Sequence, residues 1–312
     1  MSAAAYNPIR GISFKLISVA FFLVMQTCIK AAGADIPAGQ ISFFRSAFAI
    51  VPIVIYLAWL RSLPRAFYTQ NLAGHFKRGC LGVLSMVCGF YGLTMLPLPE
   101  FIAIGYASPL MAVVFASLLL GEQVRVYRWS AVLVGMTGVV IILWPKLTLL
   151  QQGGFAAGEG IGALAVLAGA VLGGLAMVQV RQLVVTEKTA TIVLYFSLTG
   201  ALLSALSLPF DWEWLDMKQT ILLISCGIAG GIAQILLTES YRHAEVSTIA
   251  PFEYSSILFG IAVSYILFGD IPTVSMLIGT AIVVCAGIFI IFREHQLGLA
   301  RKAARKASTP QG

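Results

Sequence analysis

The sequence is a succession of ten apolar stretches, each close to the length that crosses a lipid bilayer. A transmembrane helix needs about 20 consecutive apolar residues, and windows of about 19 residues place the stretches at 14–32, 41–60, 79–96, 100–120, 128–145, 161–180, 190–209, 220–238, 246–268 and 274–292. The chain is 59% hydrophobic and 11% charged, which is more apolar surface than a water-soluble core can bury. The sequence therefore predicts an all-α membrane protein with ten transmembrane helices.

Two of the stretches are copies of one pattern. Residues 97–122 match residues 245–270 at a constant offset. The matched residues, first copy before second, are Tyr106 and Tyr254, Ser108 and Ser256, Leu110 and Leu258, Leu119 and Leu267, and Gly121 and Gly269. In each copy a proline, a tyrosine and small polar residues interrupt the first half of the apolar run. The sequence therefore favours an internal repeat.

The repeat divides the chain into two halves. We expect a first five-helix repeat at 10–145, a linker at 146–160, a second five-helix repeat at 161–292 and a basic tail at 293–312. Because five is odd, the two halves enter the membrane in opposite senses, which is the inverted-repeat plan of many secondary transporters.

The basic residues predict the orientation, because Lys and Arg are enriched in short cytoplasmic loops. With the N-terminus inside, all but four of the 20 Lys and Arg residues fall on cytoplasmic segments. The exceptions are Lys30, Arg45, Lys146 and Lys218. Both termini are therefore predicted to be cytoplasmic.

Several classes of function lack their sequence signals. There is no phosphate-binding loop of the type GxxxxGK[ST], and no HExxH, GxSxG or CxxC motif. The net charge of +7 comes from residues in short gaps between apolar runs, which is unlike the basic face of a nucleic-acid-binding protein. We therefore expect no ATP-driven pump, no soluble-domain enzyme, no cofactor, no metal site and no nucleic-acid partner.

Small residues are expected to pack the helices. Gly169 and Gly173, and Gly227 and Gly231, form GxxxG motifs that allow close helix approach. Free cysteines behave as small buried residues, and all five lie in apolar runs: Cys28, Cys80, Cys88, Cys226 and Cys285.

Polar residues inside the apolar stretches are candidates for function, because they are costly in hydrocarbon. Glu253 can couple transport to protons, recognise a cationic or donor-rich group, or make a structural hydrogen bond. Arg45 can hold a carboxylate or a phosphate, or extend to the outer interface. Gln26, Gln179 and Gln234 can line a polar cavity or bridge helices.

Other charged residues stand near the ends of the stretches. Glu100 and Glu239 are expected at the membrane interface, and Lys30 is expected to extend towards it.

The hydroxyls of the two copies form a second group of candidates. Tyr106 and Ser108 lie beside Pro109, and Tyr254 and Ser256 follow Pro251. Proline frees backbone carbonyls in a membrane helix and bends it. A polar, bent segment in both halves therefore predicts a substrate site, with Pro109 and Pro251 in gating; the alternative is that these hydroxyls bond locally and line nothing.

The sequence resembles the EamA-type branch of the drug/metabolite transporter superfamily over about residues 10–292. The resemblance rests on the copies ending LLLGEQV and ILFGDIP, on Arg45, on the run YASPL at 106–110 and on Trp129 followed by Gly138. It implies ten helices in two repeats, a central cavity lined by spans one, three, four, six, eight and nine, transport without ATP, and a bacterial inner membrane. Gly105 departs from symmetry, because its counterpart in the second copy is Glu253.

The predicted function is a secondary transporter that moves a small organic metabolite by alternating access, as a monomer or homodimer in the lipid bilayer. A riboflavin-like aromatic substrate suits Tyr106, Phe252 and Tyr254; an amino acid or S-adenosylmethionine, imported or exported, would instead use Arg45 and Glu253 as a charge pair. An intramembrane enzyme or a non-transporting subunit is the alternative from another class.

Overall fold

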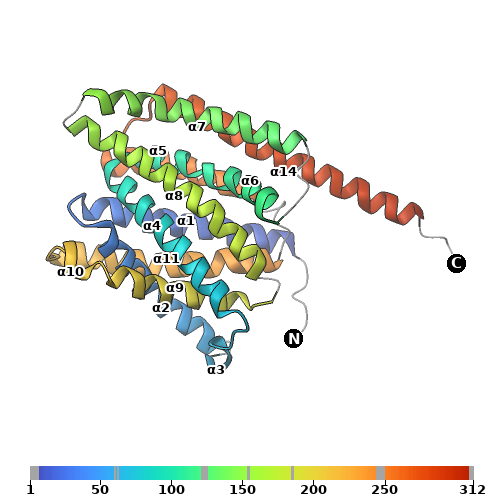
Figure 1. Ribbon diagram of the computed structural model, residues 1–312, viewed down its shortest axis with the longest axis horizontal. Helices are drawn as coiled ribbons and strands as arrows, with labels where there is room; N and C mark the ends of the chain where they lie inside the picture. Colours follow the sequence, from blue (N-terminus) through green and yellow to red (C-terminus); the bar gives the residue numbers. More distant parts are fainter. Residues whose placement is uncertain are drawn as a thin grey trace.

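The computed structural model describes residues 7–59, 61, 63–120, 126–152, 155–183, 186–243 and 250–308, and every regular element in these ranges is helical (Figure 1). The elements are α1 (Pro8–Ala32), α2 (Ala38–Trp59), α3 (Leu63–Ala66), α4 (Leu72–Met95), α5 (Leu98–Gly105), α6 (Ala107–Leu120), α7 (Val126–Gln152), α8 (Phe155–Leu183), α9 (Thr189–Ala205), α10 (Leu208–Asp211), α11 (Met217–His243), the 3-10 helix η1 (Ala250–Tyr254), α13 (Ser255–Phe268) and α14 (Val274–Ser308). The predicted all-α class is confirmed.

The apolar stretches correspond to these helices. Within the described ranges, nine helical spans are long and apolar enough to cross a membrane, and a tenth apolar helix, Phe252–Phe268, is shorter. The fourth stretch is α5 followed by α6, which meet at Tyr106. The ninth stretch begins as η1 and continues as α13. Both repeated stretches are therefore broken in their first halves, where the sequence places proline, tyrosine and serine.

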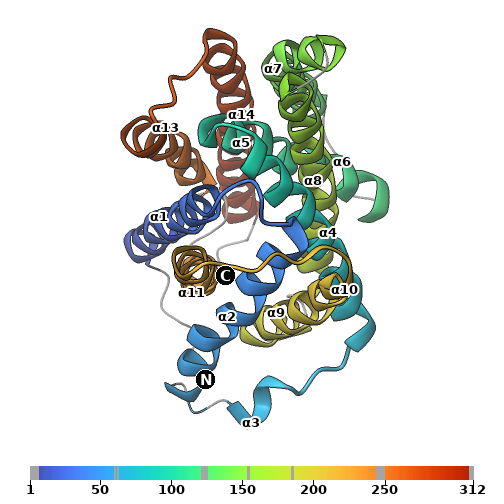
Figure 2. The same cartoon turned by 90° about the vertical axis from the view of Figure 1, so that its left-hand side faces the viewer.

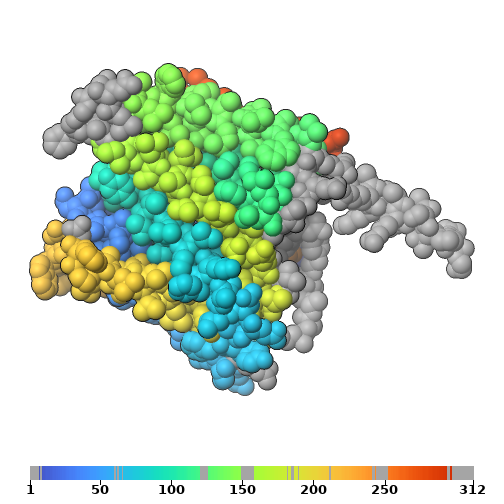
Figure 3. All heavy atoms as spheres, viewed as in Figure 1, coloured from blue at the N-terminus to red at the C-terminus, as the bar shows by residue number. Residues whose placement is uncertain are grey.

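Burial is distributed as in a membrane protein. Large apolar side chains are exposed on outward faces, among them Ile55, Trp59, Leu118, Leu133, Leu202 and Ile266. Polar and charged side chains are buried between helices, among them Lys15, Ser18, Gln40, Arg45 and Glu100. Figure 3 shows the side chains of α4, α7 and α8 closing over the gaps between the ribbons. Apolar surface outside and polar groups inside is the arrangement that lipid favours.

The main helix pairs join the two halves of the chain. The most extensive pairings are α1 with α11, α4 with α8, α7 with α14, α2 with α11 and α2 with α9, and each takes one helix from either side of residue 153 (Figures 1 and 2). Exchanging the first five spans with the last five converts α1–α11 into α8–α4, and it leaves α7–α14 and α2–α9 unchanged. These four pairings therefore have the symmetry expected of two related halves.

Close approach of α2 and α11 depends on the second GxxxG motif. A Cβ atom on Gly227 would lie 2.6 Å from the Phe44 carbonyl oxygen, and one on Gly231 would lie 2.8 Å from the Ala49 carbonyl oxygen. Backbone oxygens cannot move aside as a flexible side chain can. The predicted packing role of these glycines is confirmed.

The two segments that lie outside the expected repeats are largely helical. The segment 146–160, expected as a linker, is mostly helical, because α7 runs to Gln152 and α8 begins at Phe155. Lys146 of α7 is bonded to Glu159 of α8 at 2.6 Å, which fixes the ends of the two helices against each other. The expected tail is also helical as far as Ser308, since α14 continues beyond its apolar part. The helix α1 begins and α14 ends at the same end of the bundle (Figure 1).

Replacing Gly231 with Ala should destabilise the protein by about 1–3 kcal/mol, because the added methyl group overpacks the α2–α11 contact. Thermal unfolding of the purified protein would measure this effect. Gly89→Ala is the matched control, since the nearest atom to its Cβ would be 3.7 Å away, an ordinary contact. Equal melting temperatures for the two variants would contradict the packing role.

Candidate functional site

The break between α5 and α6 sets the position of the first tyrosine. Pro97 and Pro99 open α5, which ends at Gly105. Tyr106 follows with φ −65° and ψ −8°, and α6 starts at Ala107 with Pro109 in its first turn. A proline in a first helical turn loses no intrahelical hydrogen bond. Pro109 therefore begins a new helix after the break, where the sequence predicted a bend within a continuous one.

The second copy repeats this local geometry. Tyr254 ends the 3-10 helix η1 and has φ −68° and ψ −11°, within a few degrees of Tyr106. Ser255 then begins α13, and Pro251 is the second residue of η1. The matching register of the two sequence copies thus corresponds to a matching backbone junction.

The two junctions contact each other directly. The Tyr106 hydroxyl lies 2.6 Å from the Ser256 hydroxyl, and the rings of Tyr106 and Tyr254 meet edge to face with centroids 5.1 Å apart. Ser256 donates its own proton to the Glu253 carbonyl oxygen at 2.8 Å, so Tyr106 is the donor in the first bond. Three of the predicted residues, Tyr106, Tyr254 and Ser256, therefore form one polar cluster between the halves.

Glu253 is paired with a lysine that the sequence analysis assigned only to topology. Lys15, at the end of the second turn of α1, donates to the Glu253 carboxylate and is 2% exposed, whereas the Glu253 side chain is 44% exposed. The pair joins α1 of the first half to η1 of the second half. The position of Lys15 within the first apolar stretch was the sequence signal that could have identified this lysine as a partner for Glu253.

The remaining predicted residues lie elsewhere. The Ser108 hydroxyl faces α8, where it is 4.0 Å from the Met177 sulfur, so the structure separates it from the Tyr106 hydroxyl that it accompanies in sequence. Gln26, Gln179 and Gln234 are partly buried, and none makes a side-chain hydrogen bond to the described part of the chain. They do not act as bridges between helices in this structure.

Arg45 does not extend to the membrane interface. It is 4% exposed, and its guanidinium carbon lies 5.3 Å from the centre of the Phe196 ring in α9. It contacts none of Tyr106, Tyr254 and Glu253 within the recorded interactions. The structure therefore places it in a second polar region, between α2 and α9.

A charged network closes the end of the bundle at which α1 ends. Lys146 lies 3.0 Å from Glu100 and 2.6 Å from Glu159, and Lys30 donates to the Leu96 carbonyl oxygen at 2.7 Å. Glu100 is 4% exposed. Glu100, expected at the membrane interface, is thus buried within this end of the bundle, where the neighbouring lysine balances its charge.

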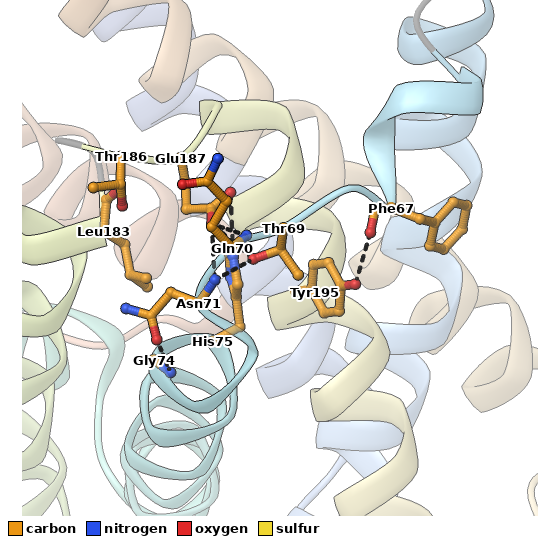
Figure 4. Close-up of polar contacts among 10 residues, drawn as sticks. All are labelled: Phe67, Thr69, Gln70, Asn71, Gly74, His75, Leu183, Thr186, Glu187 and Tyr195. Atoms are coloured by element: carbon orange, nitrogen blue, oxygen red, sulfur yellow. Dashed lines mark hydrogen bonds and ion pairs between the residues drawn. The ribbon is translucent and has the colours of Figure 1, made fainter.

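The opposite end carries a latch around Glu187, in the connection between α8 and α9 (Figure 4). The Glu187 carboxylate accepts hydrogen bonds from the Thr69 hydroxyl at 2.7 Å and from the Gln70 N–H at 2.9 Å, and it lies 3.8 Å from His75 Nε2. The His75 ring stacks on Tyr195 with centroids 4.6 Å apart. We call Thr69, Gln70, His75 and Glu187 the Glu187 latch; it joins the first half to the second.

The described residues offer no evident metal-binding site. Among the residues that the structure describes, no group of three or more His, Cys, Asp and Glu side chains is placed to hold a metal ion.

Comparison with known proteins identifies the family. The model of the EamA-like transporter family matches residues 9–144 and 160–293, which is most of the chain. The chain belongs to the EamA-like transporter family. The matches cover the two halves separately.

Named relatives of this EamA-like protein move different metabolites. It is 28% identical to the pseudopaline exporter CntI of Pseudomonas aeruginosa (strain UCBPP-PA14), over 89% of this chain and 94% of the relative. It is 26% identical to a riboflavin transporter of Vibrio cholerae serotype O1 (91% and 94% covered) and 23% identical to an S-adenosylmethionine uptake transporter of Rickettsia prowazekii (95% and 97% covered). A crystal structure that is 20% identical matches 92% of this chain and 98% of its own with a TM-score of 0.62, which shows the fold.

The pair of Lys15 and Glu253 should show energetic coupling in a double-mutant cycle. Lys15→Gln and Glu253→Gln should each lower the melting temperature. The double variant should lose less stability than the sum of the two single losses. We expect a coupling energy of about 1 kcal/mol, because Glu253 is partly exposed. Glu253→Gln combined with Lys218→Gln, an exposed lysine of α11, is the control that should be additive. Additivity in both cycles would contradict the pairing.

Proposed function

We propose that the protein is a secondary transporter in the bacterial inner membrane, which moves a small organic metabolite by alternating access between its two halves. The observation that carries the proposal is the contact of the two broken junctions at Tyr106, Tyr254 and Ser256. Broken helices in corresponding positions of two halves are the usual place of a transporter's binding site. The family match and the names of the relatives support the same class of function.

An inverted repeat would account for the helix pairing. Two five-span halves inserted in opposite senses would produce the symmetric set of pairs α1–α11, α4–α8, α7–α14 and α2–α9. We propose 10–145 and 161–292 as these halves, with both chain termini in the cytoplasm as the basic residues predict.

Alternating access needs contacts that can open at one end while those at the other close. The Glu187 latch and the pair of Lys15 and Glu253 join the halves at one end. At the other end Lys146 bonds Glu159, and Gln40 makes two hydrogen bonds to the backbone of Glu213, at 2.9 and 3.1 Å. Polar contacts of this kind can exchange for water, so we propose them as the two gates, with Pro109 and Pro251 at the junctions that move.

The tyrosine cluster suits an aromatic substrate such as riboflavin. The rings of Tyr106, Tyr254 and Phe252 offer stacking, and the named riboflavin transporters among the relatives support this class. S-adenosylmethionine or an amino acid, imported or exported, is the second candidate, supported by the other named relatives and by the charge of Glu253. Glu253 is also the residue we propose for proton coupling. Catalysis and a resident cofactor have no part in the proposal.

Uptake into proteoliposomes tests the function directly. Labelled riboflavin, S-adenosylmethionine and a mixture of amino acids would be offered separately, and Tyr106→Phe should lower uptake of the transported one about fivefold, since it removes a hydrogen bond worth about 1 kcal/mol. Tyr265→Phe is the control, because Tyr265 is 63% exposed on α13. If none of a broad metabolite panel is moved, the protein is a non-transporting subunit or an intramembrane enzyme.

The Glu187 latch should be lost in acid. Burial raises the pKa of Glu187, but the hydrogen bonds from Thr69 and the Gln70 N–H outweigh burial and hold the pKa below its ordinary value of 4.5. A carboxyl with a lowered folded-state pKa stabilises the protein above pH 4.5, and this stability is lost as the pH falls through the folded-state pKa.

The melting temperature of wild type should therefore exceed that of Glu187→Gln at neutral pH, and the difference should narrow below pH 4.5. Both proteins should also be compared in a His75→Gln background, so that protonation of His75, which faces Glu187, does not contribute to the pH dependence. A difference that stays constant down to the most acid pH would contradict the role of the carboxylate.

A further inference from the structure

A second polar region lies between α2, α4 and α9. Arg45 of α2 and Arg78 of α4 approach the same aromatic ring, Phe196 of α9, with guanidinium carbons 5.3 and 4.2 Å from its centre. Arg45 is 4% exposed, and Nε and Nη1 of Arg78 are fully buried. Two cationic side chains, Arg45 buried and Arg78 partly buried, are therefore held against one ring.

Neither arginine has an acceptor in the described part of the chain. Nε of Arg45 and both Nε and Nη1 of Arg78 are buried without a hydrogen-bond partner, and no ion pair to a described acidic residue is recorded for either arginine. A cation–π contact offsets about 0.5–2 kcal/mol, whereas an unpaired buried charge costs several kcal/mol. Mutual repulsion adds to this cost. The positive charges of the two arginines are therefore not balanced by any acidic side chain in the described ranges.

Two buried hydroxyl groups without partners in the described ranges flank Arg45 in the sequence of α2. Ser42 and Ser46 lie three residues before and one residue after Arg45 on α2, both fully buried, and neither hydroxyl has a hydrogen-bond partner in the described ranges. Ser46 faces Gly200 of α9, the helix that carries Phe196. Most of the orphaned buried polar atoms of the described chain thus gather between these three helices.

A cavity of about 580 Å³ adjoins the same helices. Gly39 of α2, Cys80 and Val83 of α4, and Leu203 and Ser204 of α9 line it. The Ser204 hydroxyl is another buried group without a partner in the described residues. The cavity lies on the same three helices but is not lined by either arginine, and its wall is mainly apolar.

We propose that Arg45 and Arg78, assisted by the hydroxyls of Ser42 and Ser46, bind the carboxylate or phosphate group of an organic anion. A guanidinium presents a planar set of donors that fits either group in two-point fashion, and serine hydroxyls add further donors. An anion here would satisfy the orphaned donors and neutralise the repulsion between the two arginines. The inference rests on the proposed transport function and narrows its substrate to an anionic or zwitterionic metabolite.

Thermal unfolding of the purified protein in neutral detergent tests the site without requiring transport. Inorganic phosphate and acetate, compared with chloride at constant ionic strength, should raise the melting temperature of wild type, and FMN should stabilise it more than riboflavin, which lacks the phosphate. Arg45→Gln and Arg78→Gln should each raise the half-saturating concentration of phosphate at least tenfold.

The matched control is Arg10→Gln, because Arg10 lies 5.5 Å from the centre of the Phe14 ring but is exposed; it should respond as wild type does. Should either glutamine variant fail to fold, Arg45→Lys and Arg78→Lys keep the charge with fewer donors and should show an intermediate affinity. A wild type that responds to phosphate and acetate no more than to chloride overturns the proposal, and so does an unchanged phosphate affinity in both arginine variants.

Further experiments distinguish a lipid headgroup from a free metabolite as the source of the anion, and they test the anion site separately from the transport function. Stabilisation by nanodiscs containing phosphatidylglycerol, with none by free phosphate, acetate or FMN, would assign the site to a lipid headgroup and overturn the substrate assignment. In proteoliposomes, equal uptake of riboflavin and FMN that Arg45→Gln leaves unchanged would overturn the anion site and leave the transporter standing. Anion binding without uptake of any metabolite would support the site and refute the transport function on which the substrate assignment rests.

Discussion

Polar groups buried in hydrocarbon must find partners within the protein, and the rest of this structure depends on that requirement. The two breaks in the apolar helices expose backbone and hydroxyl groups that a lipid-facing helix could not tolerate. They are accommodated because the breaks meet: Tyr106 donates to Ser256, and Ser256 donates to the backbone of Glu253. The two junctions thus meet between the halves, where Tyr106 of the first half bonds Ser256 of the second.

The same requirement explains why charges appear in pairs at both ends of the bundle. Lys15 pairs with Glu253, and Lys146 pairs with Glu100 and Glu159, so each buried or partly buried charge has a partner of opposite sign. The contact of Lys15 with Glu253 crosses from one half to the other. The region around Arg45 and Arg78 is the exception, because its donors are buried without counter-charges in the described chain. A missing anion is the simplest physical account of that exception.

The fold could be predicted from the sequence because hydrophobic length and period are local properties. The apolar stretches and the repeat at 97–122 and 245–270 both depend on patterns that can be read along the chain. The partners of Arg45 and Glu253 could not be predicted, since they come from helices distant in sequence: Phe196 lies in α9, and Lys15 resembled an ordinary topology residue. The neighbour of the Ser108 hydroxyl is distant in sequence too, because that hydroxyl faces Met177 of α8.

The central claim is that the two halves move against each other around the joined junctions. Electron paramagnetic resonance distances test it most directly, with spin labels on exposed positions in a background lacking the native cysteines: Tyr68 with Lys188 at the end of the Glu187 latch, and Asp35 with Trp214 at the opposite end. In nanodiscs, adding a transported metabolite or changing pH should alter the two distances in opposite directions. Two distances that remain single and fixed under all conditions, or that change in the same direction, would contradict alternating access.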